Sequence, residues 1–125
     1  MIAIMRSLMR TMLSAVPGNG AQQLELFALL NLGFVQSLAS GVLSPVEAVE
    51  RFYHSENCLY VQKQLRKREA KAIMSYGVQL PDLFDSLSAD EARREFYHEL
   101  EKIRVLCLKI LEDIRSRAFS DRAVA

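Results

Sequence analysis

Glycine, proline and runs of β-branched residues are all scarce in this chain. Five of its 125 residues are glycine and three are proline, which leaves few positions for the many tight turns of a sheet protein. Half of the residues are hydrophobic, so the chain can bury a core without disulfides or a structural metal. These features predict an all-α fold, and the length predicts a single domain over residues 1–125.

Signatures of catalysis and of ligand binding are also missing. Glycines at 18–20 follow a helix-like segment, whereas a phosphate loop follows a strand. His54 and Cys58 share a helical face, but His98 and Cys107 are nine residues apart and point in opposite directions, which excludes a four-ligand zinc site. Nothing marks an oxyanion hole beside a Cys–His pair. We therefore expect no enzymatic activity, no metal and no cofactor.

The chain has only two cysteines, Cys58 and Cys107, and both lie among apolar neighbours. A free cysteine behaves as a small buried hydrophobe, so we expect reduced thiols in a cytoplasmic protein, with a single disulfide as the alternative. The longest apolar segment, residues 24–38, is shorter than the roughly 20 residues that span a bilayer. We therefore expect no membrane span.

That apolar segment, LELFALLNLGFVQSL, is the strongest pattern in the sequence. At about 100° per residue its leucine and phenylalanine side chains point in almost every direction and leave only a narrow polar stripe. A helix that is apolar nearly all round must be covered by its neighbours. We therefore predict a bundle of five or six helices around a buried central helix, at about residues 22–40.

A helix start signal follows the central helix. Ser44-Pro45-Val46-Glu47 combines a capping serine, a proline in the first turn and a glutamate that completes a capping box. It predicts a short helix from Pro45 to about Tyr53. The side chains expected to face the core are Val46, Val49 and either Phe52 or Tyr53.

Two further helical segments are expected before residue 88. In the first, from Cys58 to Tyr76, Glu69 falls within the apolar face, which predicts a kink or break near residues 65–69. Gly77 is expected to end this segment. The second is a short helix that begins at Pro81, and its inward-facing side chains are expected to be Leu83, Phe84 and Leu87.

The longest helix is expected at about residues 89–118, after a second capping box, Ser88-Ala89-Asp90-Glu91. Its apolar residues step by four and three, close to a heptad seam: Phe96, Leu100, Ile103, Cys107, Ile110 and Ile114. Such a helix is about 45 Å long, so its distal half, from about Leu106, needs further apolar cover. Either an N-terminal helix or a second subunit would supply it, and we expect a homodimer.

Residues 1–20 combine a helical pattern with a linker sequence. Their methionine, leucine and valine residues recur with helical spacing, and the sequence VPGNG at 16–20 is typical of a linker. We expect an N-terminal amphipathic helix that docks on the bundle, with a loosely attached tail as the alternative.

Charge is nearly balanced over the chain, at +1, but it is unevenly distributed. Residues 62–81 carry five cations against one acid, a net charge of +4, and residues 82–101 carry seven acids against two arginines, a net charge of −5. Such blocks indicate pairing with a partner or another subunit, although solvated faces are the plain alternative. The residues expected on the partner surface are Asp82, Asp85, Glu91, Glu95 and Glu99.

The cationic segment within residues 62–81 favours nucleic-acid binding instead. A helix over 45–53, a turn at 54–57 and a basic helix would resemble a helix-turn-helix, with a nucleic-acid surface formed by Lys63, Arg66, Lys67 and Lys71. Lysine and arginine are the usual contacts to phosphates and bases. The turn lacks glycine, however, and the balanced charge is atypical of a DNA-binding protein. Nucleic-acid binding is therefore the alternative function.

The stretches NLGFVQSLASGVLSPVEAVERFY (residues 31–53) and YGVQLPDLFDSL (residues 76–87) resemble a small family of bacterial all-helical proteins without a known activity. The resemblance covers about residues 24–90 and rests on structural features, so it implies a fold and no site residue. Small helical bacterial proteins of this kind include immunity- or antitoxin-like partners. By this analogy we expect a function in protein–protein interaction.

Overall fold

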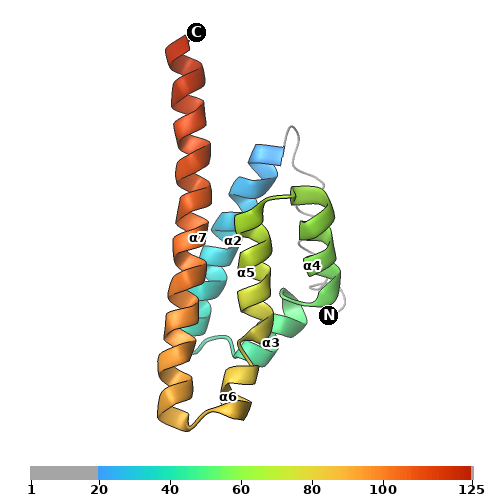
Figure 1. Ribbon diagram of the computed structural model, residues 1–125, viewed down its shortest axis with the longest axis vertical. Coiled ribbons are helices and arrows are strands. Elements are labelled where there is room, and N and C mark those ends of the chain that lie inside the picture. Colours follow the sequence, from blue (N-terminus) through green and yellow to red (C-terminus); the bar gives the residue numbers. More distant parts are fainter. Residues whose placement is uncertain (1–19, 125) are drawn as a thin grey trace.

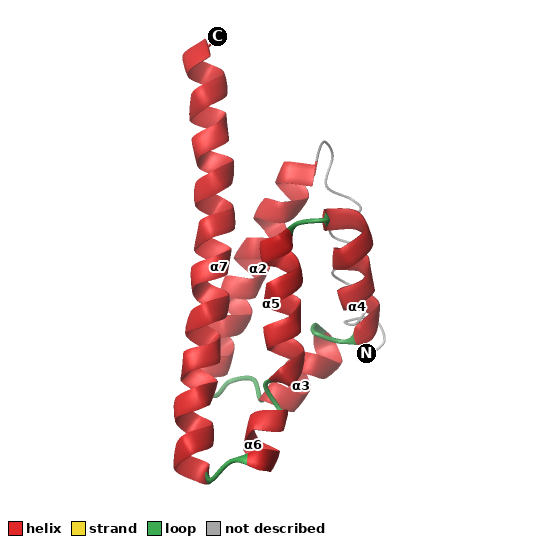
Figure 2. Cartoon of the chain, in the orientation of Figure 1, coloured by secondary structure: helices red, strands yellow, loops and turns green. Residues whose placement is uncertain are grey.

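The computed structural model describes residues 20–124, whose regular elements are all helices (Figures 1 and 2). The elements are α2 (Gly20–Ala39), α3 (Pro45–Arg51), α4 (Ser55–Tyr60), the π-helical turn η1 (Val61–Leu65), α5 (Arg68–Gln79), α6 (Asp82–Ser86) and α7 (Ala89–Val124). The all-α bundle of five or six helices is confirmed. The helix and linker expected within residues 1–20 lie outside the described residues, Gly20 excepted.

The core forms where α2 and α7 run antiparallel, with α5 packed against α7 (Figure 1). α2 buries one face, made of Phe27, Ala28, Asn31, Val35 and Leu38. The apolar seam of α7 is buried from Phe96 to Ile110, as its spacing predicts, and Ile114 is half-buried. α3, α4 and η1 cover the remaining side of this three-helix core.

One face of α2 remains open to solvent. Leu29 is 51% exposed, and Leu26 and Leu30 are half-buried. The sequence predicts cover on nearly every side, but the neighbouring helices pack against the face that contains Phe27 and Val35. α2 is therefore central in the bundle without being enclosed by it.

The start of α3 is formed as its sequence predicts. The Ser44 side chain accepts a hydrogen bond from the Glu47 backbone N–H, and the Glu47 carboxylate accepts one from the Ser44 N–H, both at 3.1 Å. Val46 departs from the prediction because it is 55% exposed, and Ala48 faces the core instead.

Both aromatic residues after α3 are buried. Helical geometry ends at Arg51, and Phe52 has an unwound backbone (φ −135°), so the successive side chains of Phe52 and Tyr53 can both point inward. The Phe52 ring packs on Phe34 with centroids 4.5 Å apart, and it meets the Tyr53 ring edge-on at 5.1 Å. Helical spacing alone allowed only one of these two residues to face the core.

The break predicted near residues 65–69 is confirmed. The chain leaves η1 through Arg66, whose backbone is left-handed (φ 52°), and α5 starts at Arg68 after the extended Lys67. Glu69 is accommodated because Lys109 lies 3.5 Å and Lys67 lies 4.0 Å from its carboxylate. A hydrogen bond from its own backbone N–H, with these two cations, lowers the pKa of Glu69.

Gly77 does not end a helix, contrary to the sequence expectation. α5 continues to Gln79, and Gly77 is buried under the Tyr53 ring, which occupies the space that a Cβ atom would need. The glycine is required by close approach of a side chain and not by a turn. Gly41, which follows α2, has a left-handed backbone (φ 79°) and serves the turn that ends the helix.

The short helix α6 is less buried than its sequence predicts. Phe84 is 47% exposed, while Leu83 and Leu87 are half-buried. The Phe84 ring contacts only the edge of the core, where it meets the Phe96 ring at 5.4 Å. A helix of five residues has too few turns to bury a complete face.

The distal half of α7 finds cover within the same chain. Cys107 and Ile110 are buried, and Ile114 lines a small cavity of about 120 Å³ together with Leu24 at the start of α2. The last turns of α7 extend beyond the other helices in Figure 1. Because α2 covers the seam as far as Ile114, the seam itself does not require a second subunit.

Two glycines in helix interiors should respond in opposite ways to alanine. Gly77→Ala should lower the free energy of unfolding by about 1–3 kcal/mol, because the new methyl group overlaps the Tyr53 ring. Gly33→Ala should raise it by about 0.5–1 kcal/mol, because nothing lies within 4 Å and alanine favours helix. Urea denaturation measures both changes. Equal effects at the two sites would contradict this packing.

The hydroxyl of Tyr53 should contribute to stability through a buried hydrogen bond. It donates to the Asn31 Oδ1 atom at 2.9 Å, and the Asn31 amide donates to the Phe27 carbonyl. Tyr53→Phe leaves the buried Asn31 oxygen without its donor, so it should cost about 1–3 kcal/mol. The matched control Tyr60→Phe, at a half-buried position on α4, should change stability by less than about 0.5 kcal/mol in the same urea experiment.

Candidate interaction surface at the α6–α7 corner

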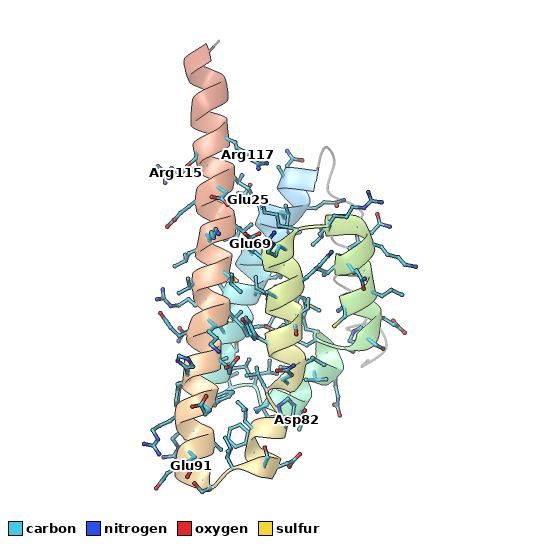
Figure 3. The ribbon with its side chains drawn as sticks, viewed as in Figure 1. Glu25, Glu69, Asp82, Glu91, Arg115 and Arg117 are labelled. Atoms are coloured by element: carbon cyan, nitrogen blue, oxygen red, sulfur yellow. The ribbon has the colours of Figure 1, made fainter. Side chains whose placement is uncertain are left out.

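Four of the five acids predicted on a partner surface gather at one end of the molecule. Asp82 and Asp85 lie on α6, and Glu91 and Glu95 lie on the first two turns of α7. Figure 3 shows Asp82 and Glu91 at this end, far from Arg115 and Arg117. All four side chains are exposed. We call these four residues the acidic corner.

Among the described residues, none of the four carboxylates of the acidic corner forms an ion pair within 4.0 Å, although Glu95 contributes to the charge that raises the pKa of Lys102. The ion pairs elsewhere in the described residues join other acids, namely Glu47, Glu69, Glu99 and Glu101. Asp82, Asp85 and Glu91 lie in first turns of helices, where a negative charge stabilises the helix by about 0.3–1 kcal/mol. This local effect does not involve Glu95, which lies one turn further along α7.

A hollow of about 590 Å³ opens between α6 and α7 at this corner. Leu83 and Leu87 supply apolar surface, and the other residues that line it are Ser86, Glu91, Arg94 and Glu95. The half-exposed ring of Phe84 lies on the same short helix. The corner therefore combines accessible apolar side chains with a rim of carboxylates.

Sequence reasoning found the acids but missed the hollow. Leu83 and Leu87 were expected to face the core completely, and Ser86 and Arg94 were not singled out. The available signal was the mixture of apolar and acidic residues in DLFDS, residues 82–86. On a helix of little more than one turn, such a mixture leaves both kinds of side chain close together.

Glu99 is set apart from the other four acids. Its carboxylate binds the Lys102 ammonium group at 2.9 Å, and this hydrogen bond raises the pKa of Lys102. The Lys102 ammonium group also lies 5.3 Å from the centroid of the Tyr76 ring. Glu99 is therefore occupied by an ion pair within α7, and the lysine of that pair contacts Tyr76 on α5.

The predicted nucleic-acid residues lie on two helices and the turn between them. Lys63 belongs to η1, Arg66 has the left-handed backbone, and Lys71 lies on α5. Residues 62–71 do not form one continuous helix, because the backbone reverses at Arg66 and Lys67, within the break predicted near residues 65–69. We call the cations of this segment the basic turn: Lys63, Arg66, Lys67, Arg68 and Lys71.

The buried polar side chains are used to hold the backbone. His54 caps α4 by accepting a hydrogen bond from the Asn57 N–H at its Nδ1 atom. The Asn57 amide in turn donates to the Phe52 carbonyl at 2.8 Å. Within residues 20–118, no group of three or more histidine, cysteine or acidic side chains is arranged to hold a metal ion.

Neither cysteine is activated. Burial raises the pKa of the Cys107 thiol to about 12, and burial also raises the pKa of Cys58. The Cys58 thiol donates to the Tyr53 carbonyl at 3.6 Å. Both cysteines are free thiols in the structure. A nucleophilic cysteine needs a lowered pKa, so neither environment favours thiolate chemistry.

Comparison of the chain with protein-family models, with curated proteins and with solved structures gives no match. The helices of the described part of the chain are each too short or too polar to cross a membrane. Among the features described, the α6–α7 corner is the one that joins a hollow, accessible apolar side chains and uncompensated charge. It is the candidate interaction surface.

The burial of Cys107 should be visible in its chemistry. In a Cys58→Ser variant, native protein at pH 8 should react with a thiol reagent roughly a thousandfold more slowly than unfolded protein, because a pKa near 12 leaves little thiolate. Addition of urea should restore the reaction. Native labelling as fast as that of free cysteine would show that the seam between α2 and α7 opens.

Proposed function

We propose that this protein acts through protein–protein contact, and that the α6–α7 corner is the contact surface. The observation that carries the proposal is the hollow bordered by Leu83 and Leu87, whose rim carries the exposed carboxylates of Glu91 and Glu95. Interfaces combine a small apolar centre with a polar rim. This corner has both parts.

The corner also defines the chemistry of a partner. An apolar side chain, or the aliphatic stem of a lysine or arginine, would fill the hollow between α6 and α7, and the charged ends of lysine or arginine side chains would meet the acidic corner. Complementary charge gives specificity and speeds association, while the apolar contact supplies most of the affinity. A small helical protein that covers a basic segment of its partner is consistent with the immunity- or antitoxin-like role suggested by analogy.

The cytoplasm is the compartment that we propose for this contact. Cys58 and Cys107 are both free thiols in the structure, and a reducing compartment keeps such thiols from oxidation.

Nucleic-acid binding is the second candidate function. It is supported by the exposure of Lys63, Arg66, Arg68 and Lys71 at one end of the molecule. A basic turn of this kind can contact phosphates, with an affinity that falls steeply with salt. The basic turn presents no continuous helix to a groove of DNA. Nucleic-acid binding is therefore less well supported than protein contact at the α6–α7 corner.

Site-specific photo-crosslinking tests the proposed contact. A photoactivatable residue in place of Ser86, which lines the hollow, should form an adduct with one discrete protein in extracts of the source cells. The same residue in place of Ser75, an exposed position on α5, should not form it. Mass spectrometry of the adduct identifies the partner and the segment in contact.

Charge reversal supplies the control for this experiment. Glu91→Lys with Glu95→Lys should remove the Ser86 adduct while circular dichroism shows an unchanged helix content, because both side chains are exposed. Equal labelling from Ser75 and Ser86, or an adduct that survives the charge reversal, would refute the α6–α7 corner as the contact surface.

A further inference from the structure

Two surfaces of opposite charge lie at opposite ends of the bundle. The basic turn joins η1 to α5 at one end, and the acidic corner lies where α6 meets α7 at the other (Figures 1 and 3). α5 separates them with 12 residues, a length of about 18 Å. Since charges are screened over about 8 Å at physiological ionic strength, the two surfaces cannot neutralise each other within one molecule.

Four of the five cations of the basic turn take part in no ion pair among the described residues. Among the described ion pairs only Lys67 takes part, at 4.0 Å from Glu69, whereas Lys63, Arg66, Arg68 and Lys71 take part in none. The side chains of these four residues are exposed. The described part of each molecule therefore carries an available cationic surface at the basic turn and an available anionic surface at the acidic corner.

The two surfaces also differ in shape. The acidic corner is hollowed and partly apolar. The basic turn is a tight reversal of the chain, in which the left-handed backbone of Arg66 turns the chain from η1 into α5. A non-glycine residue with positive φ is uncommon and has an energetic cost. This conformation places Lys63, Arg66 and Arg68 around one projecting turn instead of along a helix.

We propose that the partner of the α6–α7 corner is a second copy of this chain, whose basic turn enters the hollow. The inference rests on the proposed function and names the occupant of the same surface. The contact joins two different surfaces, so it is head-to-tail and leaves a free acidic corner at one end and a free basic turn at the other. Such a contact propagates into an open chain of copies unless the rotation closes a ring.

Analytical ultracentrifugation of the full chain tests this assembly. At low salt, about 0.01 M, where charges interact over about 30 Å before they are screened, the average mass should rise with protein concentration beyond twice the monomer mass of 14.2 kDa. At about 1 M salt, where screening acts within about 3 Å, the association constant should fall at least tenfold. A constant mass of 14.2 kDa at low salt and high concentration would overturn the proposal.

A charge swap makes the test specific. Glu91→Lys with Glu95→Lys should block assembly, and so should Lys63→Glu with Arg66→Glu, because each variant faces its own copies with like charges. An equal mixture of the two variants should assemble again, since each then meets a complementary surface. A control with Glu56→Lys and Glu112→Lys, two exposed acids outside both surfaces, should assemble like the original chain. Failure of the mixture to assemble would refute the pairing.

The Ser86 photo-adduct separates this inference from the proposed function. An adduct of twice the chain mass, with the crosslink in residues 63–71, supports the head-to-tail pairing. An adduct with a different protein, from a chain that stays monomeric, overturns the self-association and leaves the contact surface in place. A monomeric chain that binds a DNA duplex through Lys63 and Arg66 also overturns it.

Discussion

The packing of α2 against the apolar seam of α7 is the contact on which the rest of the structure depends. The seam residues recur at steps of four and three, so they form a straight stripe along a helix of 36 residues. The buried face of α2 lies on that stripe in the antiparallel direction, and α5 completes the core. Every other element is positioned by this pair, because α3, α4 and α6 are each too short to form a stable helix alone.

The short helices are held by specific polar and aromatic contacts. Tyr53 joins three of the elements at once: its hydroxyl binds Asn31 on α2, its ring covers Gly77 on α5, and its carbonyl accepts the Cys58 thiol of α4. His54 and Asn57 then fix the start of α4. Among the described side chains no buried polar atom lacks a hydrogen-bond partner. The polar groups of this region therefore fix the start of α4 and join Tyr53 to α2.

Local signals in the sequence predicted the elements well. The capping box at Ser44 and the seam of α7 each depend on residues within one or two turns, so their spacing is sufficient to predict them. The exposure of Leu29 and Val46 was not predictable in this way. It depends on which faces the neighbouring helices cover, and that is a property of the tertiary arrangement.

Gly77 and the acidic corner both have features that the sequence pattern alone does not predict. A glycine at the expected end of a helical pattern is usually a cap, and only the position of Tyr53, 24 residues earlier in the chain, reveals its other role. The acids of the corner were visible as a charge block, but the hollow beside them exists only because α6 leaves Leu83 and Leu87 half-covered. The net charge of a segment follows from its sequence, whereas a hollow depends on how the helices pack.

The length of α7 has a geometric consequence for the two charged ends. One uninterrupted helix passes Glu91 at the acidic corner and Lys109, which pairs with Glu69 beside the basic turn. Each residue between them sets about 1.5 Å of separation and about 100° of rotation. Insertion or deletion of one residue would shift both the spacing and the relative heading of the two ends, whereas seven residues, close to two full turns, would nearly preserve the heading. The length of α7 therefore helps to set the distance between the acidic corner and the basic turn, and with it the repeat distance of any array that joins these two surfaces.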